Sequence, residues 1–508
     1  MPMSVPGIRR RTRTVNYVLQ CLSATLLAIP LCRPLPASAQ ATSTIPIKNF
    51  IFIIQENHSF DNYFGTFPGA NGIPSGTMLP DYPGGPLVEK PFLGYASIPH
   101  DLKHDWRAVQ LAYDGGAMDG FFWAEWPEAE NYYGQNIVVP QPDPGLVVPK
   151  ATPTPKPGAQ GGNHARPAKN SSAEEQGEAL SPNGFADDED PDQTVPTERT
   201  AASIPKPGPT PPNIKDRPSW VLNTFSYLDY TVIPNYWEYA QKYTLCDAFF
   251  SSLEGPSLPN HLYAVSGQSG GLVYNCPNDG RKGAFNFFFP SVIDLLGNAK
   301  VTWKYYNDAV SGIAQTLWNP LPGFQAYERR NHIDVLSYIT TTPQFFQDLT
   351  NGTLPQVSYL SPSAANSEHP PNNCQTGMTY VTGLVNAVMQ SNYWPNCAII
   401  ILWDDYGGFY DHVAPQKQAD QLGYGFRVPA LVISPYSNVG VNHTTYDLTS
   451  LLKLVETAFG LSSLPPPARD GSSNTMLECF NFSQTPLPPV IITSSTKLDF
   501  SNLKPTKP

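Results

Sequence analysis

The sequence predicts an α/β fold in which helices flank a central, mostly parallel β-sheet. Three apolar runs, residues 50–54, 398–403 and 428–433, are short and show no alternation of polar and apolar side chains. Such runs are typical of strands that are buried on both faces. Segments with helical spacing of apolar residues lie between and after them, and this alternation of strands and helices favours a largely parallel sheet.

The first of these strands ends at a dense group of polar residues. Phe50 to Ile54 is followed, after Gln55, by Glu56, Asn57 and the stretch up to Asn62. Ligand sites in open α/β sheets lie beyond the carboxyl ends of the strands, so we interpret this stretch as one part of a site. The alternative is an ordinary polar turn.

The remaining elements are predicted in chain order. Helices are expected at residues 107–113, 235–240, 290–300, 343–348, 380–389 and 445–459, and the last of these is followed by Gly460. Two further strands are expected at residues 301–306 and 356–360. The chain beyond Leu464 is Pro-rich, and we interpret residues 481–508 as a C-terminal tail.

Residues 140–218 differ in composition from the rest of the chain. The sequence Pro-Lys-Pro-Gly occurs at 155–158 and again at 205–208, and large apolar residues are few. Such a segment cannot bury enough apolar surface to offset the entropy lost on ordering, so we expect a low-complexity, largely disordered insertion. It interrupts a single domain, residues 40–480, because motifs with candidate catalytic or metal-binding residues lie on both sides of it.

The N-terminal residues 1–39 have the pattern of a secretory signal peptide. A basic stretch at residues 9–13 precedes an apolar stretch at 18–31, and Ala37-Ser38-Ala39 matches a cleavage site. The protein is therefore expected to be secreted or periplasmic. This segment holds five arginines and no acid, so its removal moves the formal charge from −11 to −16. A chain this acidic is a poor candidate for binding nucleic acid, and no later segment predicts a membrane span.

The second apolar strand also ends in carboxylates, Asp404 and Asp405. A parallel sheet can place its strand ends side by side, which would bring this pair to Glu56 and Asn57. Four oxygen donors at one point suggest a divalent cation of unknown identity. The alternative for Asp404-Asp405 is a turn with a helix N-cap.

Two serines are candidate nucleophiles. Ser257, in the sequence Gly-Pro-Ser-Leu-Pro-Asn at 255–260, stands where a helix N-cap belongs, and capping alone is one interpretation. The other is a nucleophile at a helix N-terminus, where backbone N–H groups favour an anion such as phosphate. Ser269 satisfies the G-x-S-x-G pattern of serine esterases at 267–271, but no clear strand–turn–helix context surrounds it.

Two other groups of residues leave alternatives open. Five cysteines follow the signal segment, at positions 246, 276, 374, 397 and 479, and in an oxidising compartment they allow one or two disulfides of undetermined pairing. A group of aromatic residues can form either core or a wall that binds lipid or choline, and core is favoured. Its members are Phe121, Phe122, Trp123 and Trp126.

Four motifs together resemble the bacterial phosphoesterase family, of the phospholipase C and AcpA acid phosphatase type. They are residues 56–65 (ENHSFDNYFG), 255–260 (GPSLPN), 367–371 (SEHPP) and 404–413 (DDYGGFYDHV). The similarity runs from about residue 48 to residue 461, apart from the insertion. It implies an alkaline-phosphatase-like α/β sandwich, a metal site and a Ser or Thr nucleophile.

The resemblance also implies roles for individual residues. Glu56, Asn57, Asp404 and Asp405 correspond to metal ligands, and Ser257 corresponds to the nucleophile and a fifth ligand. His104 and His369 correspond to histidines of the phosphate site.

The chain departs from the phospholipase pattern in the nucleophile motif, where Ser257 replaces Thr, Leu258 replaces His and His261 replaces Arg. The expected activity is hydrolysis of phosphate esters or phospholipids through a phosphoserine. A non-catalytic secreted binding protein on the same fold is the alternative, as is a serine esterase that uses Ser269.

Overall fold

The computed structural model describes residues 45–126, 217–276, 286–308, 317–416 and 422–508. The predicted signal peptide and nearly all of the predicted insertion therefore lie outside the described residues. The described residues form one compact unit, Ile45–Pro508. Among them, no helix is both long enough and apolar enough to cross a membrane.

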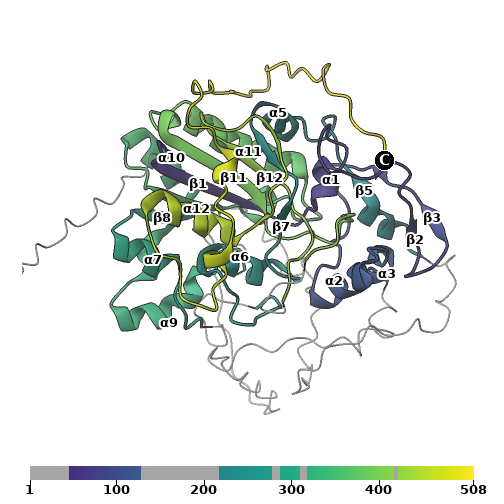
Figure 1. Ribbon diagram of the computed structural model, residues 1–508, viewed down its shortest axis with the longest axis horizontal. Helices are drawn as coiled ribbons and strands as arrows, with labels where there is room; N and C mark the ends of the chain where they lie inside the picture. Colours follow the sequence, from purple (N-terminus) through teal and green to yellow (C-terminus); the bar gives the residue numbers. More distant parts are fainter. Residues whose placement is uncertain (1–44, 127–216, 277–285, 309–316, 417–421) are drawn as a thin grey trace, which may run out of the picture. The chain divides into compact units, whose positions relative to one another are not determined.

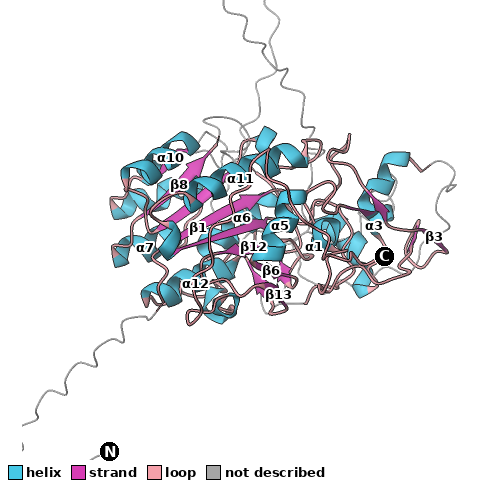
Figure 2. Ribbon diagram, turned by 90° about the horizontal axis from the view of Figure 1, so that it is seen from above, coloured by secondary structure: helices cyan, strands magenta, loops and turns pink. Residues whose placement is uncertain are grey.

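The centre of the fold is an eight-stranded sheet with the order β13-β6-β12-β11-β1-β10-β8-β9 (Figures 1 and 2). All neighbouring pairs are parallel except those made by β12, which runs antiparallel to both β11 and β6. The α/β fold with a mostly parallel sheet is thus confirmed. The strands of this sheet are β1 (Asn49–Gln55), β6 (Thr244–Cys246), β8 (Trp303–Asn307), β9 (Ile339–Thr341), β10 (Val357–Ser361), β11 (Cys397–Trp403), β12 (Ala430–Ile433) and β13 (Gly440–Asn442).

Seven of the described α-helices have at least two turns. They are α2 (Trp106–Tyr113), α5 (Pro234–Lys242), α6 (Ser257–Ser266), α7 (Val292–Ala299), α10 (Thr342–Asn351), α12 (Thr449–Phe459) and the longest, α11 (Cys374–Met389). The predicted helices are present, although α11 begins at Cys374 rather than at Tyr380. Shorter elements are α1 (Phe60–Phe64), α3 (Phe121–Ala124), α9 (Gln325–Glu328), β2 (Leu79–Pro80), β3 (Leu87–Glu89), β4 (Phe92–Leu93), β5 (Ser226–Tyr227), β7 (Phe249–Phe250) and β14 (Tyr446–Asp447).

Helices cover both faces of the sheet (Figure 2). On one face, Phe50 packs edge-on against Phe459 of α12, and the Tyr359 hydroxyl donates to the carbonyl of Ala264 in α6. On the other face, Tyr306 packs against Phe345 of α10, and Trp403 packs against a tyrosine of α5. Because successive side chains of a strand point to opposite faces, the central strands are apolar throughout, as the sequence predicted.

Strand β1 lies between β10 and β11 and is buried along its whole length. Its five residues from Phe50 to Ile54 are at most 1% exposed. Full burial of such side chains contributes roughly 1.5–3 kcal/mol each. The candidate site lies at the carboxyl ends of this strand and its neighbour β11.

The chain beyond α12 contains short 3-10 helices and extended segments. Ile492 is buried there, and its backbone exchanges two hydrogen bonds of 2.6 and 3.1 Å with the Asn386 side chain of α11. Part of the predicted C-terminal tail is therefore packed against the domain.

Candidate metal and phosphate site

The carboxyl ends of β1 and β11 lie side by side. The two strands pair in parallel, with Ile54 opposite Leu402 and Gln55 opposite Trp403. The next residues, Glu56-Asn57 and Asp404-Asp405, therefore leave the sheet at the same edge. The backbone N–H of Asn57 donates to Asp404 Oδ1 at 3.0 Å, across 347 positions of sequence.

The backbone around Asn57 is tightly constrained. Asn57 has a positive φ of 63°, which a non-glycine residue adopts only at a cost of order 1–3 kcal/mol. Gly407, with φ of 59°, passes so close that an added Cβ would lie 2.1 Å from the Asn57 carbonyl oxygen. Its N–H donates to Asp405 Oδ1 at 2.8 Å. Only glycine fits at this position, which explains why the Asp-Asp pair is followed by Tyr-Gly-Gly.

Helix α6 delivers Ser257 to these carboxylates. The structure makes Ser257 the first residue of the helix and Pro256 its N-cap, without a capping hydrogen bond from a side chain. The interpretation of Ser257 as an N-cap is therefore wrong, because Pro256 already has the extended conformation of a cap. The Ser257 hydroxyl instead hydrogen-bonds to Glu56.

Four buried oxygens of this group have no hydrogen-bond partner within the described residues. They are Glu56 Oε2, Asn57 Oδ1, Asp404 Oδ2 and Asp405 Oδ2. Burial, followed by repulsion from Asp404, raises the pKa of both Glu56 and Asp405 well above its usual range. Buried carboxylates with unused lone pairs are costly unless they are paired with a cation or protonated. The residues therefore fit a divalent cation.

His261 joins this group from the next turn of α6. Its Nε2 lies 3.0 Å from Glu56 Oε1 and 3.7 Å from Asp404 Oδ2, and all three side chains are completely buried. Glu56, His261 and Asp404 form a cluster with the spacing of metal ligands. Burial lowers the pKa of His261 to about 4 against the opposing effect of Asp404, so the imidazole is neutral. The sequence signal for this contact is the i, i+4 spacing from Ser257.

His104 lies against the amide of Asn57. Its Nδ1 faces the carbonyl of Leu102 at 2.7 Å, and its Nε2 faces Asn57 Nδ2 at 2.8 Å. This contact holds the amide of Asn57, whose Oδ1 has no hydrogen-bond partner within the described residues. Burial opposes protonation of His104, but the charges of Asp405 and Asp101 raise its pKa to about 9.

The contact with Asn57 favours the neutral ring, because an amide N–H donates only to an unprotonated nitrogen. A cation beside Asp405 would weaken the field that raises the pKa of His104.

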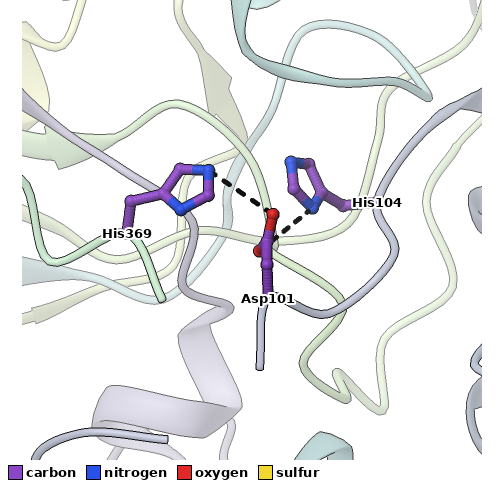
Figure 3. A group of neighbouring side chains, drawn as sticks. All are labelled: Asp101, His104 and His369. Carbon is purple, nitrogen blue, oxygen red and sulfur yellow. Dashed lines mark ion pairs between the residues drawn. The ribbon is translucent and has the colours of Figure 1, made fainter. Parts of the chain in front are cut away.

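Asp101 lies between His104 and His369 (Figure 3). Its carboxylate is 4.0 Å from His104 Nδ1 and 3.8 Å from His369 Nε2, and the two rings are 5.8 Å apart. His369 Nδ1 faces the carbonyl of Pro370 at 2.6 Å, which leaves Nε2 directed at Asp101. No sequence pattern singled out Asp101, which lies in an irregular loop and is partly exposed.

Glu368 anchors the loop that carries His369. Its buried carboxylate accepts hydrogen bonds from four side chains: Tyr63, Tyr236, Gln55 and Trp403. Burial raises the pKa of Glu368 to about 8, against the opposing effect of these hydrogen bonds. With a φ of 73°, Glu368 is also strained. The network fixes this strained loop and with it the position of His369.

The other polar residues of the first motif have structural contacts. Asp61 pairs with buried Arg427 at 3.0 Å and with His412 at 2.6 Å, while His58 contacts the side chain of Asn62 at 2.8 Å. Asp61, Asp411 and His412 also have the spacing of metal ligands, but Arg427 already provides their positive charge. This cluster links the first and fourth motifs.

Two alternatives from the sequence find no support in the geometry. Ser269 follows the C-cap of α6, Gly267, and so is not on a turn from strand to helix. Its hydroxyl is buried and has no hydrogen-bond partner among the described residues, and thus no base there. The aromatic residues 121–123 and 126 are at most 3% exposed and form a second core cluster, as favoured from the sequence.

The fold and this group of residues define an α/β protein with a candidate metal centre at the carboxyl edge of a mostly parallel sheet. The sequence profile of the phosphoesterase family matches residues 47–139 and 181–462, and the chain belongs to this family. The match omits residues 140–180, which lie within the predicted insertion.

Similarity to individual proteins agrees with this assignment. Phospholipase C B of Mycobacterium tuberculosis is 31% identical over 300 residues, which cover 50% of this chain and 56% of that protein. Phospholipase C A of the same organism is 25% identical over 503 residues, covering 87% of this chain and 78% of that protein. The chain thus spans about half the length of the first of these relatives.

Among solved structures, a Vibrio parahaemolyticus protein in the alkaline phosphatase superfamily aligns with 48% of this chain and 64% of its own. Its sequence identity is 14% and its TM-score is 0.31.

Proposed function

We propose that this protein is a metal-dependent phosphoesterase that hydrolyses phosphate esters through a phosphoserine at Ser257. The observation that supports the proposal most strongly is the position of Ser257. It begins a helix, contacts Glu56 and lies at the edge of the sheet where four buried oxygens lack partners among the described residues. Helix N-termini favour anions such as phosphate.

The proposed ligands of the ion are Glu56, Asn57, Ser257, Asp404 and Asp405. Bound there, a divalent ion supplies positive charge that favours the ionised hydroxyl and offsets the charge of the phosphoryl group. The protein's own contribution is to hold these oxygens on two central strands and one helix. Because the strands are packed on both sides, the groups are positioned before substrate arrives.

In the proposed reaction, Ser257 Oγ, having lost its proton to water, attacks phosphorus. A bond forms between Oγ and phosphorus while the bond to the ester oxygen breaks. His369 Nε2 gives a proton to the leaving oxygen, and Asp101 at 3.8 Å stabilises the protonated ring before transfer. Water then attacks the phosphoserine, His369 accepts its proton, and Ser257 is regenerated.

His104 receives a positioning role in this scheme. Its contact with Asn57 Nδ2 orients the amide, so that Oδ1 faces the candidate ion. Groups that orient metal ligands in this way typically change affinity by roughly 10–100-fold when removed. The proton transfer is accordingly assigned to His369, whose Nε2 faces Asp101 at 3.8 Å, whereas Nε2 of His104 is already occupied by Asn57.

The test compares Ser257→Ala with Ser269→Ala on p-nitrophenyl phosphate and on phosphatidylcholine. We expect Ser257→Ala to lose turnover of every substrate that the wild type cleaves, and Ser269→Ala to keep it. Trapping the phosphorylated enzyme at low pH should locate the phosphoryl group on Ser257 by mass spectrometry. Full turnover by Ser257→Ala would overturn the proposal, and the two substrates distinguish a phospholipase C from an acid phosphatase.

We further propose that residues 1–39 direct export and that the mature chain begins at Gln40. The support is the pattern of basic, apolar and small residues in the sequence. N-terminal sequencing of protein recovered from the periplasm or medium of an expressing bacterium tests this. A chain that still begins at its first methionine would contradict it.

A further inference from the structure

Helix α6 presents two side chains to the ends of the central strands. Ser257 and His261 lie one turn apart and therefore share a face. His261 is completely buried, and its Nε2 is directed at two acidic side chains, Glu56 and Asp404. A buried imidazole placed between two candidate ligands of the same ion calls for an explanation beyond packing.

The distances around His261 are close to the separation of neighbouring metal ligands. Two donor atoms that each lie about 2.1 Å from a metal, at tetrahedral or octahedral angles, are roughly 3.0–3.4 Å apart. Nε2 is 3.0 Å from Glu56 Oε1 and 3.7 Å from Asp404 Oδ2. The contact with Glu56 therefore suits a shared ion as it stands, and the contact with Asp404 suits it once Oδ2 moves about 0.3 Å closer.

The competing explanation is a single hydrogen bond from His261 to Glu56 without metal contact. In that arrangement the neutral ring donates its one N–H to Glu56 Oε1, and an ion held by Glu56 and Asp404 would satisfy their oxygens that lack partners within the described residues. The geometry favours direct contact because Nε2 lies beside both carboxylates, and therefore beside any ion that they share. His261 Nδ1 has no hydrogen-bond partner in the described part of the chain in either arrangement, so it does not distinguish them.

We propose that His261 is a direct ligand of the ion through Nε2, which makes this a mixed nitrogen and oxygen site. The inference depends on the proposed metal-dependent function and specifies the class of ion. Imidazole favours borderline transition ions such as Zn²⁺, whereas an all-oxygen set suits Mg²⁺ or Ca²⁺. The site should therefore prefer a first-row transition ion.

The first measurement uses the wild-type full chain. The protein is stripped with a chelator and loaded with Mn²⁺, and pulsed electron paramagnetic resonance then detects whether a nitrogen atom is bonded to the ion. We expect a directly coordinated nitrogen. Its absence in Mn²⁺-loaded wild type would overturn the proposal, whatever the variants do.

The second measurement compares ion selectivity among variants by calorimetric titration with Zn²⁺ and Ca²⁺. His261→Gln places an oxygen at similar reach, and His261→Leu removes the donor. We expect both to reduce the preference for Zn²⁺ over Ca²⁺ at least about tenfold, and His261→Gln to lose the nitrogen signal. His443→Gln is the matched control, because His443 also contacts a carboxylate, Asp247 at 2.8 Å, outside this cluster.

The outcomes distinguish a failure of the metal-dependent function from a failure of the ligand role of His261. A wild-type protein that retains none of these ions would overturn the metal-dependent function and this inference together. Ion binding with unchanged selectivity in both His261 variants would overturn only the role of His261. A selectivity change in His443→Gln of equal size would likewise remove the case for His261.

Discussion

Asn57, just beyond the end of β1, is constrained by several independent contacts. Asn57 has a left-handed backbone, its amide is oriented by His104, and its N–H is bound by Asp404. Gly407 closes over it so tightly that its lack of a side chain is a geometric requirement. Strain of this kind persists only where surrounding structure enforces it.

The close approach of Gly407 predicts a large effect of Gly407→Ala. The new Cβ would lie 2.1 Å from the Asn57 oxygen, so Asn57 must move and ion binding should weaken. Gly352→Ala is the control, since Gly352 has a φ of 72° and a Cβ added there would meet no atom of the described residues within 4 Å. We expect the control to cost about 1–2 kcal/mol and Gly407→Ala clearly more. Chemical denaturation and metal titration measure both, and equal costs would contradict the steric argument.

A second residue-scale prediction concerns Glu125. It is buried, its carboxylate accepts the N–H of Lys103, and burial raises its pKa from 4.5 to about 8. Between these two values the folded state holds a proton that the unfolded state has lost. Stability therefore falls as the pH rises through this window, by up to about 1.4 kcal/mol for each pH unit.

Replacing Glu125 with Gln should remove this contribution. We expect the difference in unfolding free energy between pH 5 and pH 8 to shrink in the variant relative to wild type. Urea denaturation at several pH values measures it. Identical pH dependence in the two proteins would show that Glu125 ionises normally in the folded state.

At the scale of elements, the loop after β10 is held by other elements rather than by its own backbone. Tyr63 of α1, Tyr236 of α5, and Gln55 and Trp403 of β1 and β11 all donate to Glu368. His369 follows directly and has the role of proton donor in the proposed reaction. The position of the acid thus depends on side chains of four other elements.

The double variant Tyr63→Phe, Tyr236→Phe tests this dependence. It removes two donors to Glu368 with little change of volume, so the loop should loosen and kcat should fall. Metal affinity should stay unchanged because the ligands lie on other segments. Steady-state kinetics and calorimetry separate the two effects, and a loss of metal affinity equal to the loss of kcat would contradict the assignment.

Two cysteines on different segments lie close enough to form a disulfide. Cys246 of β6 and Cys479 lie with their sulfur atoms 3.7 Å apart, across 233 positions of sequence, and both are buried. We expect protein produced in an oxidising compartment to contain this disulfide, which would tie the C-terminal segment to the sheet. Peptide mapping without reduction checks it, with Cys397 as a cysteine that should remain a thiol.

For the molecule as a whole, the central strands and the helices were predictable, because their apolar patterns are local. The meeting of Glu56-Asn57 with Asp404-Asp405 was also expected, since parallel strands share one carboxyl edge. The start of α11 was not predictable. Cys374 to Thr379 are mostly polar or small, and only the N-cap residue Asn373 marks where the helix begins.

The details of the site required the three-dimensional structure. The sequence does not show that Pro256 takes the cap position and releases Ser257, nor that His261 reaches Glu56. Asp101 lies in no recognisable motif, and only its position between two histidines in the structure identifies it as a candidate site residue. The two-residue strands β2, β4, β5, β7 and β14 are too short to give a periodic signal.

The family match predicts that part of the chain can be removed. It omits residues 140–180, within the proposed insertion, so deleting them should leave the thermal unfolding midpoint and the metal affinity nearly unchanged. Circular dichroism on heating and calorimetry measure these quantities. A variant that no longer unfolds cooperatively would show that this segment belongs to the folded domain.

The distance in sequence between the two halves of the site also sets an order of events. Asn57 and Asp404 are 347 positions apart, so no nascent or truncated chain that ends before Asp405 holds the complete ligand set. Closing so large a loop requires most of the sheet to assemble first. Capture of the ion should therefore follow folding rather than nucleate it, and the rate of ion uptake during refolding would report the last step of assembly.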